Sequence, residues 1–170
     1  MRGLLPNARV PSLPQALREQ LDAFIMGPTL VRQAVEGLDA GLLNRRPPGD
    51  DWSIRDIVVH LSDAEMLGAV RIRLALAEES PALPVYEQDA WKRRLQYLWR
   101  DPEAALSLFH QTRYATAEIL DHCGADAWQR VGIHPERGPL TVADLVTMYV
   151  DHVTEHVAQI DKARASSTGG

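Results

Sequence analysis

Residues 53–79 read SIRDIVVHLSDAEMLGAVRIRLALAEE, and this segment has the pattern of a long amphipathic helix. Its apolar residues recur every three or four positions, which predicts one buried face. Ser53 and Asp56 have the spacing of a capping box, so the helix should begin at about Ile54. Two prolines follow the segment and should end the helix near Glu79.

The same criteria predict three more long helices and a short one. A first helix should be broken or kinked at Gly27-Pro28, and the stretch from Ala125 to Pro139 shows no periodicity and is expected to be a surface loop. No segment alternates as a strand would. The fold class is therefore all-α, a four-helix bundle with long connections and a short extra helix. Besides the helix from Ile54, the expected helices are Leu13 to about Leu38, Asp89 to Trp99 (the short one), Pro102 to His122 or Cys123, and Val142 to about Ile160.

Composition predicts a single domain over residues 1–170, with a core from about 13 to 163, a loose N-terminal arm and a flexible C-terminal tail. The 18 Lys and Arg against 23 Asp and Glu give a net charge of −5, without a basic cluster. Nucleic acid and anionic membrane surfaces are therefore unlikely partners, and no apolar run is long enough to span a bilayer. The single cysteine, Cys123, cannot form an intramolecular disulfide, which fits a cytoplasmic protein.

Histidines carry the chemical signal of this sequence. His152 and His156 are four residues apart on the last predicted helix, so their rings should project from one face and could share a metal ion. His60, in the apolar stripe of the helix from Ile54, is the natural third ligand. From spacing alone, the alternative stays open that His60 is a hydrogen-bonded core residue and that the histidine pair belongs to a solvated face. The remaining histidines, His110, His122 and His134, are expected to be structural.

Three parts of the chain together resemble one known family. They are residues 49–65 (GDDWSIRDIVVHLSDAE) with Arg71-Ile72-Arg73 after them, residues 141–145 (TVADL), and residues 151–160 (DHVTEHVAQI). Trp-Ser before a histidine-bearing helix and the late His-x-x-x-His-x-x-Gln-Ile are the most specific elements. On these motifs the chain, from about residue 17 to 162, resembles the DinB-like superfamily of metalloenzymes.

The resemblance implies a four-helix bundle, often a homodimer, in which three histidines bind a divalent metal, frequently zinc or nickel. The matching positions here are His60, His152 and His156. The activities known in the family are thiol transferases that use bacillithiol or glutathione and mycothiol-dependent maleylpyruvate isomerases. Nothing in the sequence selects one of these branches.

A three-histidine site with an open position can activate water for hydrolysis or hold a low-molecular-weight thiol as a nucleophile. We therefore expect a metal-dependent transferase acting on small electrophiles or a hydrolase; the alternative is a non-catalytic metal-binding or interaction module. Glu155 and Asp63 are the candidate catalytic carboxylates, although a solvated helix surface is the commoner fate of such residues. Arg71 and Arg137 are candidate contacts for a small-molecule substrate.

The entrance to such a site depends on the direction of the two ligand-bearing helices. The loop before Trp52 and the segment Gly132–Pro139 each precede one of them. If the helices run parallel, both segments lie at one end of the bundle and form the entrance.

Overall fold

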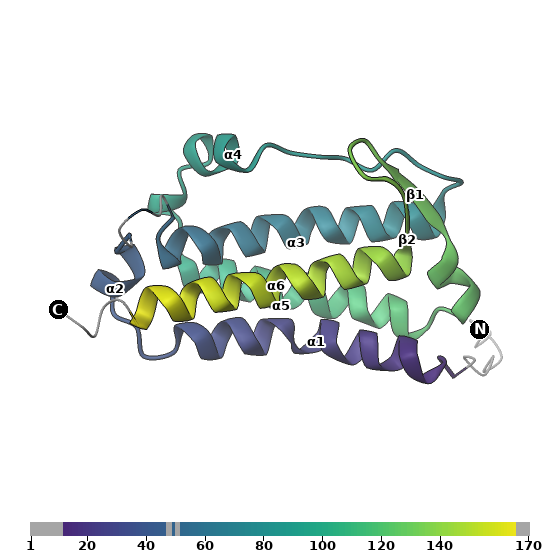
Figure 1. Cartoon of the computed structure of the whole chain (residues 1–170), viewed down its shortest axis with the longest axis horizontal. Helices are drawn as coiled ribbons and strands as arrows, with labels where there is room; N and C mark the ends of the chain where they lie inside the picture. The colour runs from purple at the N-terminus through teal and green to yellow at the C-terminus, as the bar shows by residue number, and fades with distance from the viewer. Residues whose placement is uncertain (1–11, 47–48, 50–51, 166–170) are drawn as a thin grey trace, which may run out of the picture.

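The computed structural model describes residues 12–46, 49 and 52–165, and in this part of the chain four long helices form a bundle (Figure 1). The all-α, four-helix prediction is confirmed. None of the described helices is both long and apolar enough to cross a membrane. The predicted N-terminal arm and C-terminal tail lie outside the described residues. The bundle helices are α1 (Gln15–Val35), α3 (Ile54–Ala77), α5 (Pro102–Asp121) and α6 (Val142–Ala165).

Helix starts coincide with the capping residues in the sequence. The backbone N–H of Asp56 donates to Ser53 Oγ at 3.1 Å, and the Ser53 N–H donates back to the Asp56 carboxylate at 3.0 Å, so the predicted capping box of α3 is present. Thr141 and Asp144 form the same reciprocal pair at the start of α6. Asp101 caps α5. These bonds satisfy backbone donors that the first helical turn leaves free.

The connection from α3 to α5 returns along the outside of the bundle. It comprises residues 78–101 and includes α4 (Gln88–Arg94) and a 3-10 turn at Tyr97–Trp99 (Figure 1). Because the chain crosses back before α5 begins, α5 runs parallel to α3. The contacts between them keep the same order along both segments: Arg55 donates to the Arg100 carbonyl, and Arg73 donates to Thr116.

Helix α6 consequently runs antiparallel to α3, with which it packs, and parallel to α1. The expectation of parallel ligand-bearing helices is therefore wrong. A bundle whose direction alternates at every helix would make α3 and α6 parallel, but the long crossover inverts the last two helices. Because α3 and α6 begin at opposite ends of the bundle, their starts share no end, and the entrance expected at a shared end is wrong (Figure 1).

The segment before α6 is a β-hairpin rather than an irregular loop. Strands β1 (Val131–His134) and β2 (Gly138–Thr141) pair antiparallel, and Gly138 takes a positive φ of 75° at the turn. The hairpin is fixed to the start of the crossover, because the Ile133 N–H donates to the Pro81 carbonyl at 2.8 Å. Two four-residue strands are too short to show an alternating pattern, which is why the sequence did not reveal them. A short helix, α2 (Ala40–Asn44), was also missed.

Helix α1 continues through Pro28, so of the two outcomes expected at Gly27-Pro28, a break or a kink, the break does not occur. Proline has no N–H, and this leaves the carbonyl of Phe24, four residues earlier, without its helical donor. The Arg113 Nη1 fills that place and donates to the Phe24 carbonyl at 3.2 Å. Gly27 provides the space, because a Cβ there would lie 2.6 Å from Arg113 Nη1.

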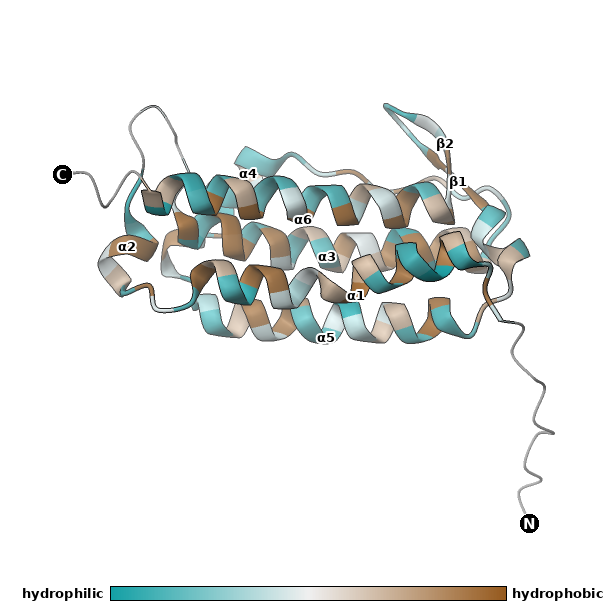
Figure 2. Cartoon of the chain, turned by 60° about the horizontal axis from the view of Figure 1, so that its bottom comes forward, coloured by the Kyte–Doolittle hydropathy of each residue, from teal (hydrophilic) through white to brown (hydrophobic). Residues whose placement is uncertain are grey.

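Arg113 lies in a buried layer to which all four long helices contribute. Its Nη2 donates to the Glu65 carboxylate of α3 and to the Tyr149 carbonyl of α6, while its guanidinium lies 4.0 Å from the Phe24 ring centroid. Two apolar clusters fill the bundle, one on each side of this layer. The first surrounds Ile57 and Phe109, and the second lies nearer the end of the bundle that carries the hairpin. Figure 2 shows the hydrophobic residues on the inner faces of the helices.

We predict that Arg113→Met destabilises the protein by about 3–5 kcal/mol, because it leaves the buried Glu65 carboxylate without its cation. Chemical denaturation followed by circular dichroism measures this loss. The matched control is Arg32→Met, which breaks an exposed Arg–Glu pair with Glu103 on the surface of α1 and α5. That change should cost less than about 1 kcal/mol. Equal losses in the two variants would contradict the structural role assigned to Arg113.

Candidate metal centre and adjoining cavity

Three histidines from α3 and α6 converge with their ring nitrogens facing one another. His60 Nε2 lies 3.0 Å from His152 Nε2, and His156 Nε2 lies 3.1 Å from His152 Nε2. One ligating atom from each ring falls within 4.8 Å of the other two. His60 is fully buried and the other two rings are half-buried. The structure thus brings together the three residues that the sequence singles out.

Local structure fixes each ring. His60 is two turns into α3, whose capped start sets its height, and the Trp52 ring stands edge-on to it with centroids 5.1 Å apart. His152 and His156 are successive residues of one α6 face, with ring centroids 4.6 Å apart. Their separation of four residues produces this approach without any loop.

The spacing of the nitrogens fits a shared divalent ion. Two nitrogens each about 2.1 Å from one metal are about 3.0–3.4 Å apart for angles between a right angle and a tetrahedral one. The two measured separations of 3.0 and 3.1 Å fall in that interval. Nitrogen donors of this kind suit zinc, nickel and other late transition metals better than magnesium or calcium.

A neighbouring side chain orients one of the three histidine rings. The Gln159 Oε1 lies 2.9 Å from His156 Nδ1 and accepts a hydrogen bond from the ring N–H at that position. The lone pair of His156 Nε2 is then directed at the other two rings. This is the usual task of a residue that contacts a metal ligand from behind. On the opposite side, the Tyr86 hydroxyl of the crossover lies 3.5 Å from His60 Nδ1, a long contact.

The site favours uncharged imidazoles. Burial lowers the pKa of His60 to about 2, with further lowering from His152 and His156, and burial lowers the pKa of His152 to about 3, with contributions from His156 and Arg113. Burial also lowers the pKa of His156. At neutral pH all three rings are therefore neutral, the form in which histidine binds metals.

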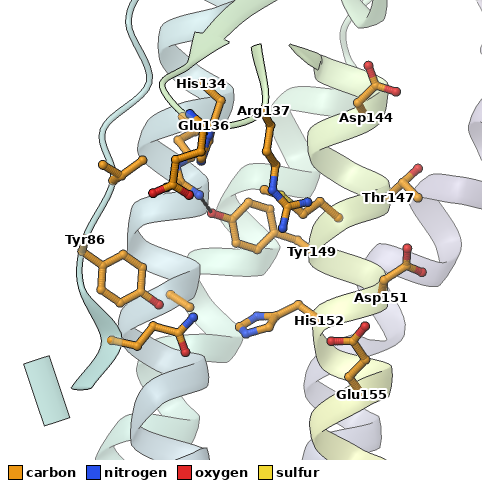
Figure 3. A pocket seen from close by; sticks show the side chains of 15 residues that line it. Tyr86, His134, Glu136, Arg137, Asp144, Thr147, Tyr149, Asp151, His152 and Glu155 are labelled. Carbon is orange, nitrogen blue, oxygen red and sulfur yellow. Dashed lines mark hydrogen bonds between the residues drawn. The ribbon is translucent and has the colours of Figure 1, made fainter. Parts of the chain in front are cut away.

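A cavity of about 480 Å³ opens beside His152 on the flank of the bundle. Figure 3 shows its walls: α6 carries His152 and Tyr149, the crossover carries Tyr86, and the hairpin turn carries Glu136 and Arg137. A second hollow, which shares Tyr86 and Glu136 with the first, reaches His156. The site is therefore approached from the side of the bundle, between the crossover and α6.

The two candidate carboxylates occupy different settings. Glu155 is exposed and lines the cavity beside His152. Asp63 is buried, and both of its oxygens accept from Arg100 Nη1, at 2.7 and 2.6 Å. Of the two, only Glu155 is free to face a molecule in the cavity.

Both candidate arginines line the same cavity, although they are 66 positions apart in the chain. Arg71 is buried, and its Nη1 donates to the Tyr149 hydroxyl at 3.0 Å. Arg137 is exposed at the hairpin turn and points toward Tyr149 (Figure 3). The cavity therefore has a cationic side away from the histidines.

Sequence reasoning missed three cavity residues. Tyr149 is three residues before His152, so helical spacing could have placed it on the same face. Tyr86 belongs to the crossover, and His134 belongs to the hairpin, where it was expected to be structural. No sequence signal shows that these two segments fold back over α3 and α6.

A family model described as the DinB superfamily matches residues 23–160. Among relatives in sequence, the Bacillus subtilis protein named "Putative metal-dependent hydrolase YfiT" is 28% identical over 148 residues, covering 84% of this chain and 83% of the relative. A Geobacillus thermodenitrificans protein, named "Putative metal-dependent hydrolase", is 30% identical over 152 residues, covering 87% and 84%.

Solved structures confirm the fold. The structure of Bacillus subtilis YfiT, described as a four-helix bundle of unusual topology, superposes with a TM-score of 0.83 at 23% identity and covers 100% of this chain and 94% of that chain. A mycothiol-dependent maleylpyruvate isomerase superposes with a TM-score of 0.67 at 16% identity, covering 85% of this chain and 60% of the isomerase.

We predict that the metal-free protein loses stability as the pH falls. The pKa values of about 2 for His60 and about 3 for His152 lie below the ordinary value of 6.5, so the unfolded chain takes up protons that the folded chain refuses. The two rings leave the free energy of unfolding unchanged above about pH 6.5. Toward pH 4 the free energy of unfolding falls by up to about 1.4 kcal/mol per pH unit for each ring.

Urea denaturation in the presence of a chelator, at a series of pH values, measures this dependence. The His152→Asn variant should lose stability less steeply on acidification than the wild type. The control is His122→Asn, a change at the C-cap of α5 that touches none of the three converging rings. It should keep the wild-type slope of stability against pH. Identical slopes for His152→Asn and the wild type would contradict the assignment.

Proposed function

The chain belongs to the DinB superfamily, and from that premise we propose that it is a metal-dependent enzyme whose His60, His152 and His156 hold one divalent ion, zinc or nickel. The observation that carries the proposal is the convergence of three neutral imidazoles with Nε2 separations of 3.0 and 3.1 Å. All three ligands are neutral, so the ion keeps its full charge, and the adjoining cavity gives a small molecule access to it.

Hydrolysis of a small substrate is the reaction that we favour, in keeping with the names of the relatives in sequence. A bound divalent ion supplies Lewis acidity, which lowers the pKa of a water or thiol in contact with it. Glu155, at the cavity wall, is placed to accept the proton that the nucleophile gives up. Asp63 is held by Arg100 and is better suited to fixing the crossover than to moving protons.

A thiol nucleophile is the second candidate. The cavity of about 480 Å³ is far larger than a water molecule requires and has the size of a small-molecule site. The mycothiol-dependent enzyme with the same fold supports a transferase that uses a low-molecular-weight thiol. A non-catalytic metal-binding module is the remaining alternative, and the predicted homodimer stays a prediction.

We predict that His152→Ala and His156→Ala each lower the metal content to below about a tenth of the wild-type value, because two imidazoles hold an ion much less tightly than three. Elemental analysis of protein purified without a metal-affinity column measures the content. Gln159→Ala should weaken metal affinity about 10- to 100-fold, since it frees the His156 ring. His122→Ala is the control and should leave the metal content unchanged. Full occupancy in His156→Ala would refute the ligand set.

A further prediction separates catalysis from a structural role of the metal. Chelation should abolish turnover while the far-ultraviolet circular dichroism keeps most of its helical signal, because the apolar clusters support the bundle without the ion. Turnover is assayed on small esters, amides and chlorinated or epoxide acceptors, each with and without glutathione, bacillithiol or mycothiol.

The pattern of turnover decides between the alternatives. Thiol-independent hydrolysis restored by adding zinc or nickel supports the hydrolase, and thiol-dependent turnover supports the transferase. Global unfolding on chelation would make the metal structural, and a metal-loaded protein inactive in every assay would favour the non-catalytic module.

A further inference from the structure

The part of the cavity wall between His152 and the hairpin presents hydrogen-bond donors (Figure 3). Arg71 is the first of them, because its guanidinium is buried and held in place: Nε donates to the Pro84 carbonyl at 2.8 Å, and Nη1 donates to the Tyr149 hydroxyl at 3.0 Å. Neither bond is with a carboxylate. The positive charge of Arg71 therefore has no counter-charge in contact among the described residues.

Tyr149 supplies a second donor. Its oxygen already accepts from Arg71, so its own proton is available for an acceptor in the cavity. Burial raises the pKa of Tyr149, which keeps the phenol protonated. Gly68 of α3 lies against the ring, since a Cβ there would be 2.5 Å from Tyr149 Cζ, and this close contact fixes the hydroxyl in position.

The hairpin supplies two more donors. The backbone N–H of Glu136 donates to His134 Nδ1 at 3.2 Å, so the neutral His134 ring carries its proton on Nε2. His134 is buried against the cavity, and its pKa is lowered by burial and by the nearby Arg71 and Arg137 charges. The exposed Arg137 guanidinium points from the hairpin turn toward Tyr149 (Figure 3).

We propose that this wall is a carboxylate-binding subsite and that the substrate of the enzyme carries one carboxylate, held by Arg71, His134, Arg137 and Tyr149. Two guanidiniums and two neutral donors match the acceptor oxygens of a carboxylate. The inference rests on the proposed function in one respect only, in treating the bound anion as part of the substrate.

The acidic residues of the cavity favour a substrate with a single negative charge. Glu136 of the hairpin and Asp144, Asp151 and Glu155 of α6 line the same cavity and would repel a second anionic group. The subsite also has a defined distance from the histidines, because the Tyr149 and His152 ring centroids are 6.5 Å apart. The reacting group of the substrate therefore lies only a few bonds from its carboxylate.

The test uses N-acetylglycine as the carboxylate probe and N-acetylglycinamide as its neutral counterpart, titrated into the metal-free, chelator-treated full chain and followed by two-dimensional NMR. We expect shifts at residues of the cavity wall and a Kd at least about tenfold lower for the acid than for the amide. Equal binding of the two probes would overturn the proposal.

Two variants assign the binding to the wall. Arg137→Gln removes an exposed guanidinium, and Tyr149→Phe removes one hydroxyl; each should raise the Kd for N-acetylglycine about tenfold. Arg93→Gln, an exposed change on α4 outside the cavity, is the control and should leave the Kd unchanged. Unchanged binding in both wall variants would overturn the subsite.

A last variant separates this inference from the metal proposal. His156→Ala removes a histidine that does not line this cavity, so binding of N-acetylglycine should stay within about twofold of the wild type. Loss of binding in that variant would mean that the carboxylate is held at the histidines, which overturns the subsite. If carboxylate binding behaves as expected while elemental analysis finds no metal, the proposed function fails and the subsite stands.

Discussion

The ion pair between Arg113 and Glu65 is the constraint on which the rest of the bundle depends. A buried guanidinium is costly to desolvate, and hydrogen-bond partners and a counter-charge offset that cost. Here the partners come from α1, α3 and α6, while α5 carries the arginine itself. The hydrogen bonds of Arg113 therefore link the four long helices at one level along the bundle axis.

This placement extends directly to the functional site. The Tyr149 carbonyl accepts from Arg113, the Tyr149 side chain packs on Gly68, and His152 follows one turn later on α6. A shift of α6 by one turn would displace His152 and His156 by about 5.4 Å along the helix axis relative to His60, and the three rings would no longer meet. The same contacts thus align the proposed metal ligands with the wall of the cavity.

The sequence was informative wherever the signal is local. The capping at Ser53 and Thr141, the projection of His152 and His156 from one face, and the buried stripe around His60 follow from helical geometry and were recovered. The relative direction of α3 and α6 was not recovered. Periodicity shows which face of a helix is buried, but the pattern is the same whether the helix runs up or down the bundle. The residues that crossover and hairpin bring to the cavity, Tyr86 and His134, depend on contacts between segments about fifty positions apart, which periodicity does not report.

The crossover has a consequence for how such proteins diversify. It forms one side of the cavity and runs along the outside of the bundle, with only Leu83 and Tyr97 of its described residues inserted into the apolar clusters. It is held at one end by the Pro81 and Pro84 carbonyls and at the other by Arg100. Between these anchors, insertions and substitutions can reshape the cavity while the buried layer and the three histidines stay as they are. The fold thus places one wall of the cavity on a connection that carries neither the three histidines nor the buried layer around Arg113.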